Sequence, residues 1–489
     1  MTQEAAKGET ARRLAPRPPT HPAQGLATNP VPGAVPRQNP GQIPDQPPAQ
    51  TPEQTADHAP GQVPNARAWW VLGMLAFVYM VNFLDRQLLS ILAKPIQDTL
   101  HVTDAQLGRI GGLYFALFYC FIAIPVGWLA DRTHRVRILA LACAIWSAAT
   151  AACGVAATYG ELVAARMTVG FGEAGGVPPS YALISDYFPP QRRGTALALY
   201  NLGPPVGQAL GIAFGALIAA SFSWRAAFLA IGAVGLGAAV LVLLRIPEPR
   251  RGRLDPPAAP SSAPASPAAT TRFWPATARF FARPSFVLVA LASGATQFIT
   301  YGAGNFTALI LMREKGMSLR QLAVSYALVV GLCMGGGIFV SGRVIDRFTP
   351  RAKQAYALIP AVSLVCAAPL FVAFVWAPHW PLALAFLAGP TFFNSFYLSS
   401  AVALVQQDAA PNERVISGAL LLLIMNMIGL GLGPTYVGWA SYALRSSHPQ
   451  HALQWAFYSL TPFYGLAIAL FLALARVLPR ERLTPEIRT

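Results

Sequence analysis

The chain has 489 residues, of which 54% are hydrophobic and only 11% are charged, and its mean hydropathy is +0.45. Soluble globular proteins carry about a quarter charged residues, so this composition excludes an ordinary soluble protein and favours one that crosses a membrane many times. The net charge of +16 does not indicate a nucleic-acid-binding protein, because the basic residues cluster at the ends of apolar runs, where they set membrane topology.

Residues 1–65 are rich in proline and lack clusters of apolar side chains. Such a segment cannot bury enough surface to offset its loss of conformational entropy, so we predict a disordered N-terminal tail. A second segment, 247–285, is rich in proline and alanine and is predicted to be a cytoplasmic linker. Residues 477–489 are predicted to form a cytoplasmic C-terminal tail.

Twelve apolar runs are long enough to cross about 30 Å of hydrocarbon as helices. Six precede the linker and six follow it, so we predict an all-α, multi-pass membrane protein with two six-helix halves, 66–246 and 286–476. The expected spans are 69–93, 106–130, 136–157, 161–187, 195–221, 226–246, 286–312, 321–344, 355–377, 381–407, 414–442 and 452–476.

Basic residues are more than twice as frequent in the loops on the side of the two termini as in the opposite loops. Loops rich in arginine and lysine stay in the cytoplasm, so both termini are predicted to be cytoplasmic. The arginine- and alanine-rich composition suggests a bacterial cytoplasmic membrane as the location.

An internal repeat connects the two halves. GWLADRTHRVR (127–137) follows the second span, and GRVIDRFTPR (342–351) follows the eighth, so each half carries G-x-x-x-D-R before a basic loop. Gly-Pro pairs in the fifth, tenth and eleventh spans predict breaks in those helices. Two repeated halves are typical of a transporter whose binding site lies between them.

These motifs resemble the major facilitator superfamily. The loop G-x-L-A-D-R-x-x-R is similar to its signature loop, and RMTVGFGEAG (166–175) is similar to its fourth-helix pattern. More narrowly, NFLDRQLLSIL, GEAGGVPPSYALISDYFPPQRRGTALALYNLG and SWRAAF resemble the Spinster-like branch. The resemblance covers residues 69–476 and implies the major facilitator fold, transport by alternating access and, in the Spinster-like branch, lipid-like substrates.

The resemblance also implies a cytoplasmic gate at the two signature loops. Each loop places a carboxylate beside the start of a helix in the other half, where free N–H groups favour a negative charge by roughly 0.3–2 kcal/mol. The two loop glycines would allow close helix approach. An ordinary basic loop with an incidental acid is the alternative. The gate residues are Gly127, Asp131, Arg132, Arg135, Gly342, Asp346 and Arg347.

Four charges lie within predicted membrane spans, namely Asp85, Arg86, Arg166 and Glu173. A charge at this depth costs at least about 2.5–3.5 kcal/mol, so such residues pair with one another or face an aqueous cavity. A rise of 1.5 Å per residue places Arg166 near the depth of Asp85 and Arg86, with Glu173 near the midplane. We predict one four-charge cluster in which Asp85 and Glu173 carry protons. A static network of salt bridges is the alternative.

Polar residues elsewhere in the spans are candidates for lining a substrate cavity, with hydrogen bonding between helices as the alternative role. With Arg86 and Arg166 they form the candidate substrate or charge-network set: Asn82, Gln297, Tyr301, Asn305, Asn394, Tyr397 and Asn426.

The favoured function is a secondary transporter, coupled to protons, for an organic amphipathic or anionic solute that can be lipid-like. A proton-coupled symporter of small organic acids or sugar acids and a non-transporting membrane receptor are the alternatives. No enzyme motif, nucleotide-binding motif or metal-ligand spacing is found in the sequence, and the five cysteines fit neither a metal site nor a disulfide framework. We therefore expect no catalytic activity, cofactor or metal, and a monomer in the lipid bilayer.

Overall fold

The computed structural model describes residues 65–481, apart from 131, 252–253, 255–272 and 411–412. The predicted N-terminal tail lies outside the described residues except for Asn65, whose side chain caps the first helix. Every regular element of the described part is helical. The helices of the first half are α2 (Ala66–Ile91), α3 (Ala93–Leu100), α4 (Asp104–Arg109), η2 (Ile110–Tyr114), α5 (Phe115–Ala130), α6 (Arg135–Val155), α7 (Tyr159–Glu173), α8 (Val177–Tyr187), α9 (Pro190–Tyr200), α10 (Gly203–Ser221) and α11 (Trp224–Arg245).

The second half repeats this organisation after the linker. Its helices are α12 (Phe273–Ala282), α13 (Pro284–Arg313), α14 (Leu319–Gln321), η3 (Leu322–Tyr326), α15 (Ala327–Val329), η4 (Val330–Met334), α16 (Gly335–Phe348), α17 (Ala355–Trp376), α18 (Trp380–Phe393), α19 (Phe396–Asp408), α20 (Arg414–Asn426), η5 (Met427–Leu432), α21 (Gly433–Leu444), α22 (Ala452–Tyr458) and α23 (Thr461–Glu481). Helix α12 lies inside the segment expected to be linker, and α23 extends into the expected C-terminal tail.

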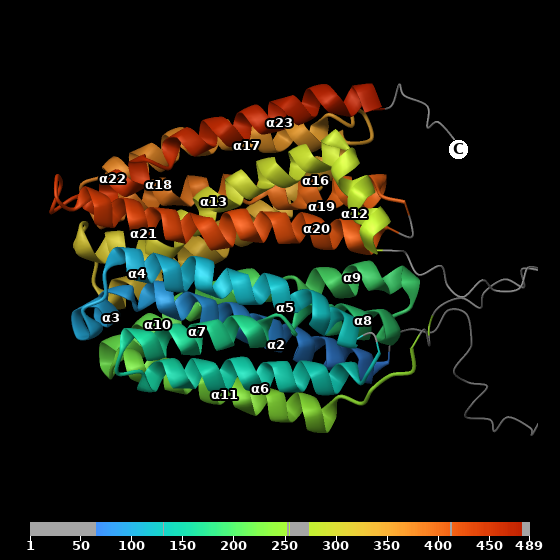
Figure 1. Ribbon diagram of the computed structural model, residues 1–489, viewed down its shortest axis with the longest axis horizontal. Coiled ribbons are helices and arrows are strands. Elements are labelled where there is room, and N and C mark those ends of the chain that lie inside the picture. The colour runs from blue at the N-terminus through green and yellow to red at the C-terminus, as the bar shows by residue number, and fades with distance from the viewer. Residues whose placement is uncertain (1–64, 131, 252–253, 255–272, 411–412, 482–489) are drawn as a thin grey trace, which may run out of the picture. The chain divides into compact units, whose positions relative to one another are not determined.

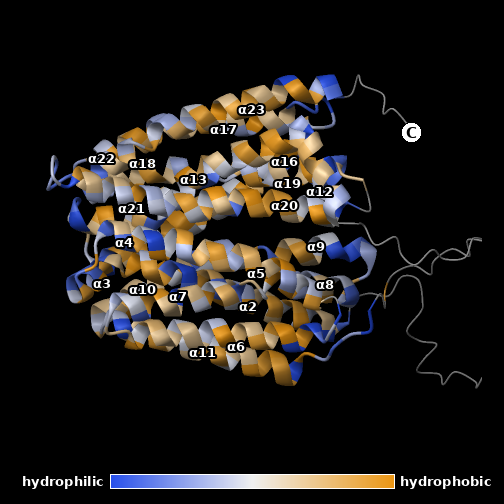
Figure 2. Ribbon diagram, in the orientation of Figure 1, coloured by the Kyte–Doolittle hydropathy of each residue, from blue (hydrophilic) through white to orange (hydrophobic). Residues whose placement is uncertain are grey.

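The helices run side by side, with α2–α11 and α12–α23 in separate groups (Figure 1). We call the end at which α2 begins and α23 ends the terminal end, and the opposite end, with α3, α4 and α22, the distal end. Apolar residues predominate along the helices, and polar residues gather at the two ends (Figure 2). Eleven described helices are long and apolar enough to span a membrane. The twelfth span, the fourth in order, is divided into α7 and α8.

The break in the fourth span falls at residues 174–176, directly after Glu173. Glycine is a poor helix former and proline lacks an N–H group, so the sequence Ala-Gly-Gly-Val-Pro-Pro ends one helix and starts another. The break therefore places a carboxylate at the C-terminal end of a helix within the bundle.

The tenth span is broken in the corresponding place of the second half, but not where the sequence suggested. Pro390 lies inside α18, and the helix ends only at Phe393, so that Asn394 and Ser395 separate α18 from α19. The prediction of a break at Gly389–Pro390 is thus wrong by a few residues. A proline removes one helical hydrogen bond, and neighbouring helices in a bundle can compensate for that loss.

Close packing between the two halves occurs at the distal end. A Cβ atom at Gly108 would collide with the carbonyl oxygen of Pro434, and one at Gly112 would lie 2.6 Å from the carbonyl oxygen of Gly431. The N–H of Leu113 donates to Thr435 Oγ1 at 3.1 Å. Glycine at these positions lets α4 and η2 touch the backbone of η5 and α21.

Candidate functional site

Helix α2 carries two charges side by side that point to different helices. Consecutive residues of an α-helix are separated by about 100° around its axis, so Asp85 and Arg86 cannot share one partner easily. Asp85 faces α6, where it accepts a hydrogen bond from Thr150 Oγ1 at 2.6 Å. Arg86 faces the end of α7, where its Nε donates to Glu173 Oε2 at 2.6 Å.

The four charges form two crossed pairs between α2 and α7. Arg86 pairs with Glu173, whereas Arg166 Nη1 lies 3.7 Å from Asp85 Oδ1. The first pair is a short charge-assisted hydrogen bond, and the second is a longer electrostatic contact. The side chains of Asp85, Arg166 and Glu173 are at most 3% exposed, and that of Arg86 is 12% exposed. The cluster holds two acids and two bases and is neutral when all are ionised.

Aromatic rings surround Arg86. Its guanidinium carbon lies 4.8 Å from the ring centre of Phe83, 5.1 Å from that of Phe115 and 4.7 Å from that of Tyr119. The guanidinium carbon of Arg166 lies 5.5 Å from the ring centre of Phe115. Cation–π contacts of this kind stabilise a buried cation by roughly 0.5–2 kcal/mol each. The rings therefore hold the charge of Arg86 within the bundle even when its carboxylate partner changes.

The charge cluster keeps unused hydrogen-bonding capacity. One oxygen of each acid, Asp85 Oδ1 and Glu173 Oε1, has no hydrogen-bond partner, and neither do Nε and Nη1 of Arg166. Buried polar groups are almost always hydrogen-bonded in proteins, so these atoms are open to a further partner such as water, a proton or a ligand. Each acid can therefore accept a further donor or a proton at its free oxygen.

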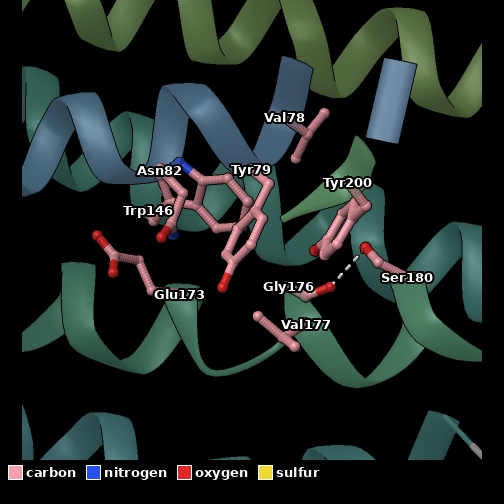
Figure 3. Close-up of a pocket in the computed structure, with 9 residues that line it drawn as sticks. All are labelled: Val78, Tyr79, Asn82, Trp146, Glu173, Gly176, Val177, Ser180 and Tyr200. Atoms are coloured by element: carbon pink, nitrogen blue, oxygen red, sulfur yellow. Dashed lines mark hydrogen bonds between the residues drawn. The ribbon is translucent and has the colours of Figure 1, made fainter. Parts of the chain in front are cut away.

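A small cavity adjoins Glu173 and is shown in Figure 3. Asn82 and Trp146 line it beside the carboxylate, and the stacked rings of Tyr79 and Tyr200, 4.5 Å apart, form its far part. The indole Nε1 of Trp146 has no hydrogen-bond partner either. The residues that line the cavity give the buried carboxylate of Glu173 polar neighbours. Of these neighbours, the sequence analysis predicts only Asn82 as a site residue.

The candidate residues of the second half divide into two groups. Tyr301 packs against the buried core of the first half, and the backbone carbonyl of Asn305 accepts from Ser90 Oγ of α2 at 2.9 Å. Asn394 instead donates to Tyr464 Oη at 3.0 Å, a hydrogen bond between helices of the second half. Asn394 thus shows the hydrogen-bonding role between helices that was the alternative expectation.

Three other candidates from the second half lie away from the two crossed ion pairs. Gln297 is buried beside Gly429, where a Cβ atom on the glycine would meet its side chain. Tyr397 is buried in the core of the second half. Asn426 ends α20 and is partly exposed. Within the described part of the chain, no hydrogen bond connects these three side chains to the four charges.

The signature-loop residues do not form a closed gate in this conformation. Asp131 lies outside the described residues. A Cβ atom at Gly342 would meet nothing within 4 Å, and one at Gly127 would meet only Pro178 of its own half, at 4.0 Å. Arg132 stacks on Trp128, and Asp346 and Arg347 are exposed. The expected close approach of these two glycines is therefore not seen here, because the halves are packed together at the distal end instead.

In this conformation Arg135 makes its contacts inside the first half and not across the expected gate, so its gate role stays a prediction. It is buried within the first half, where it pairs with Asp186 and donates to Glu248 at 2.8 Å and to the carbonyl of Pro249 at 3.1 Å. Glu248 also accepts from the N–H of Val136 at 2.8 Å. The network joins the start of α6, the end of α8 and the chain after α11, so Arg135 stabilises the first half internally.

Sequence reasoning missed Thr150 and the aromatic rings around Arg86. A threonine in an apolar helix is common, and nothing in the sequence shows which helix will face Asp85. Phe115 and Tyr119 are spaced four apart and so share a helix face, a signal that could have been noticed. The described residues include no group of three or more histidine, cysteine or acidic side chains arranged to bind a metal.

Comparison with known proteins places the fold in a family. The model of the Major Facilitator Superfamily matches residues 75–434. An MFS-type efflux pump of Mycolicibacterium smegmatis is 31% identical over 86% of this chain and 95% of its own length. The hexuronate transporter of Bacillus subtilis is 26% identical over 75% of this chain and 87% of its own length.

A solved structure extends the comparison. It is a bacterial homologue of the human lysosomal transporter Spinster in an inward-facing and unoccupied conformation, with a TM-score of 0.78 and 28% identity over 86% of this chain and 99% of that one. These relatives are transporters and not enzymes. The chain is an integral multi-pass membrane protein that belongs to the major facilitator superfamily of transporters of organic solutes and resembles its Spinster-like branch.

Proposed function

We propose that the chain is a proton-coupled secondary transporter that moves an amphipathic or anionic organic solute by alternating access. The observation that supports this proposal most is the crossed pairing of Asp85, Arg86, Arg166 and Glu173 between α2 and α7. A neutral cluster with one free oxygen on each acid can take up a proton or an anion, and either event changes its charge. A structural network alone needs no such free acceptor.

The proton step is assigned to Glu173, with Asp85 as the second acid. Glu173 Oε2 holds Arg86, and Oε1 is free beside the cavity. A proton on Glu173 removes its charge and weakens the bond to Arg86, whose guanidinium then attracts an anion. Release of the anion restores the pair and expels the proton. Proton and anionic substrate thus bind cooperatively, because protonation of Glu173 frees the guanidinium of Arg86 for the anion.

The surroundings of Arg86 favour a substrate with an anionic head and an apolar body. The guanidinium forms charge-assisted hydrogen bonds with phosphate or carboxylate, while Phe83, Phe115 and Tyr119 provide apolar surface beside it. A lipid-like anion fits this description, and the likeness to a sphingosine-1-phosphate transporter of Danio rerio, 25% identical over 79% of this chain, supports it. A sugar acid is the second candidate, which the likeness to a hexuronate transporter favours.

For the transport cycle we propose that the two halves, 66–246 and 286–476, rock against each other around the charge cluster. The excess of basic residues supports a cytoplasmic location for the terminal end, and with that orientation the conformation described here is closed on the outside. The signature loops, with Asp131 and Asp346, would close the cytoplasmic side in the other state. The cytoplasmic membrane of a bacterium is the proposed location, and the monomer is the proposed unit.

Reconstituted protein tests this function directly. Liposomes that contain the purified protein are loaded in turn with a lysophospholipid, a phosphorylated long-chain amine and a hexuronate. Counterflow of each compound is then measured with and without an imposed pH gradient. We expect counterflow of one of these anions, accelerated by the gradient. Binding of such an anion without counterflow would instead indicate a non-transporting receptor.

A further inference from the structure

A second ionic cluster lies at the distal end, away from the four charges of the proposed transport site. Asp104 begins α4 of the first half and is 6% exposed. Its two oxygens accept from Arg313 Nη1 and Nη2, each at 3.0 Å, and Oδ2 also accepts from Ser441 Oγ at 2.6 Å. Gln97 of the first half donates to Oδ1 at 2.6 Å. Arg313 and Ser441 belong to the second half, so one buried carboxylate joins the two halves.

The bidentate geometry between Arg313 and Asp104 is that of a strong ion pair. A planar guanidinium that donates two parallel hydrogen bonds to one carboxylate fixes distance and orientation together. The backbones are also close here, because a Cβ atom on Gly438 would collide with the carbonyl oxygen of Asp104. The pair between Asp104 and Arg313 therefore lies where the halves must separate if the distal side opens.

Arg313 has a second acid beside it, on its own half. Its Nη2 lies 3.9 Å from Oε1 of Glu314, whose side chain is only 3% exposed. Neither oxygen of Glu314 accepts a hydrogen bond of ordinary geometry, although the backbone N–H of Gln454 faces the carboxylate. A buried carboxylate that is so poorly hydrogen-bonded is unfavourable when ionised, and binding a proton or drawing a cation closer relieves this cost.

Two other residues that can carry a positive charge lie near Glu314, but neither donates a hydrogen bond to its carboxylate. His451 of α22 has its Nδ1 4.0 Å from Glu314 Oε2 and an exposed ring. Lys315 is adjacent in sequence, but its Nζ donates to the carbonyls of Val375 and Ala377 at 2.8 and 2.5 Å. Arg313 is thus the cation with room to move, and it can move towards Glu314 only by loosening its bond to Asp104.

We propose that Arg313 is the shared cation of a distal gate, in which Asp104 holds the two halves together and Glu314 competes for the same guanidinium according to its protonation. With Glu314 protonated, Arg313 stays on Asp104 and the distal side is closed. With Glu314 ionised, Arg313 is drawn back to its own half and the distal side opens more readily. This inference rests on the proposed alternating access, and it adds a pH response on the distal side that is separate from the proton step at Glu173.

The direction of the pH response follows from the burial of Glu314. Burial raises the pKa of Glu314 above its usual value, and Arg313, His451 and Lys315 partly offset this. Because the pKa of Glu314 is raised in the closed state, a proton on Glu314 stabilises that state. This stabilisation is complete at pH values below the ordinary pKa of a glutamate. It is lost as the pH rises through the raised pKa. Acidic solution should therefore close the distal gate, and alkaline solution should open it.

A distance measurement on the whole protein in lipid nanodiscs tests this proposal. Spin labels are placed at Asp98→Cys and Ser446→Cys, two exposed positions at the distal ends of the two halves, after replacement of the five native cysteines. For the otherwise unaltered protein we expect a longer-distance population that grows with pH. Asp104→Asn should enlarge that population roughly tenfold at every pH, since it removes charge-assisted hydrogen bonds. Glu314→Gln should keep the short distance throughout and remove the pH response.

Two control variants identify the titrating group. His451→Asn should leave the pH response in place, and so should Glu161→Gln, which removes an exposed acid at the same end of the first half. A pH response that persists in Glu314→Gln or disappears in His451→Asn would overturn the role of Glu314. Unchanged distances in Asp104→Asn, in protein shown by its melting curve to be folded, would overturn the gate.

The experiment also separates this inference from the proposed function. Distances report the gate even in a protein that shows no counterflow. If liposomes show no transport while the distances respond to pH as described, the proposed transport function fails and the gate stands. If transport is present and the distances ignore Glu314, the gate fails alone.

Discussion

Arg86 and Glu173 form a 2.6 Å ion pair between α2 and the broken end of α7, and the carboxylate keeps one oxygen free. The bond holds together two helices of the same half, so it can form and break without separation of the two halves. That property suits a pair whose state is set by a proton or a bound anion.

Arg86→Ala should weaken the binding of the anionic substrate and destabilise the protein. It leaves Glu173 buried without its partner, and breaking a buried ion pair in this way costs about 3–5 kcal/mol. Thermal melting in detergent and substrate binding measure the two effects. The double variant Arg86→Ala/Glu173→Gln should regain part of the melting temperature but not the binding. Recovery of both would contradict a role of Arg86 in binding.

Thr150→Val should disturb Asp85, and it also removes a 2.8 Å contact between the Thr150 hydroxyl and the Trp146 carbonyl of the same helix. The substitution keeps the shape of the side chain and removes the hydroxyl that donates to Asp85 at 2.6 Å, so we expect a loss of about 1–3 kcal/mol of stability and a changed transport rate. Thr168→Val is the matched control, because Thr168 is exposed and donates only to the Ala164 carbonyl of its own helix. Equal melting temperatures for the two variants would show that the bond to Asp85 contributes nothing.

Two glycine substitutions should shift the conformation in opposite directions. Gly108→Ala places a methyl group against the Pro434 carbonyl, and overpacking of this kind costs about 1–3 kcal/mol, so the distal side should open. Gly342→Ala has free space in this conformation and should be tolerated here while it hinders closure of the terminal end. The spin-label distance between Asp98→Cys and Ser446→Cys should lengthen in the first variant only. Identical distances in both would contradict rocking about these contacts.

Arg135→Ala should lower the stability of the first half. It removes the guanidinium that Asp186 and Glu248 share near the terminal end, and we expect the loss of these charge-assisted hydrogen bonds to cost about 1.5–3 kcal/mol. Arg135→Lys should recover only part of it, because an ammonium group cannot reproduce the planar set of donors. Melting curves measure both variants. If Arg135→Ala changed gate opening and left the melting temperature unaltered, a gating role would be favoured over the structural one.

Much of the architecture follows from local sequence signals. Long apolar runs predict the spans, and charges inside them single out Asp85, Arg86, Arg166 and Glu173 because a buried charge requires a partner. The Gly-Gly-Val-Pro-Pro sequence marks the break after Glu173, which falls inside the predicted span 161–187. These features depend on composition and neighbouring residues, which the sequence contains directly.

The remaining features depend on contacts between distant residues. Asp104 and Arg313 are 209 positions apart and look like ordinary charges at helix ends, so only the fold shows that they bind each other. The crossed pairing of the four charges depends on the rotation of α2 about its axis, which hydropathy does not fix. The position of Thr150 opposite Asp85 depends on the packing of α6, for the same reason.

We propose that Glu173, with Asp85, carries the transported proton. Uptake by liposomes with and without an imposed pH gradient tests this most sharply, using Glu173→Gln and Asp85→Asn beside the unaltered protein, with melting curves for each. We expect both variants to keep substrate counterflow but to lose its acceleration by the gradient. Uptake by both variants with an undiminished response to the gradient would contradict it and would make the four charges a structural network.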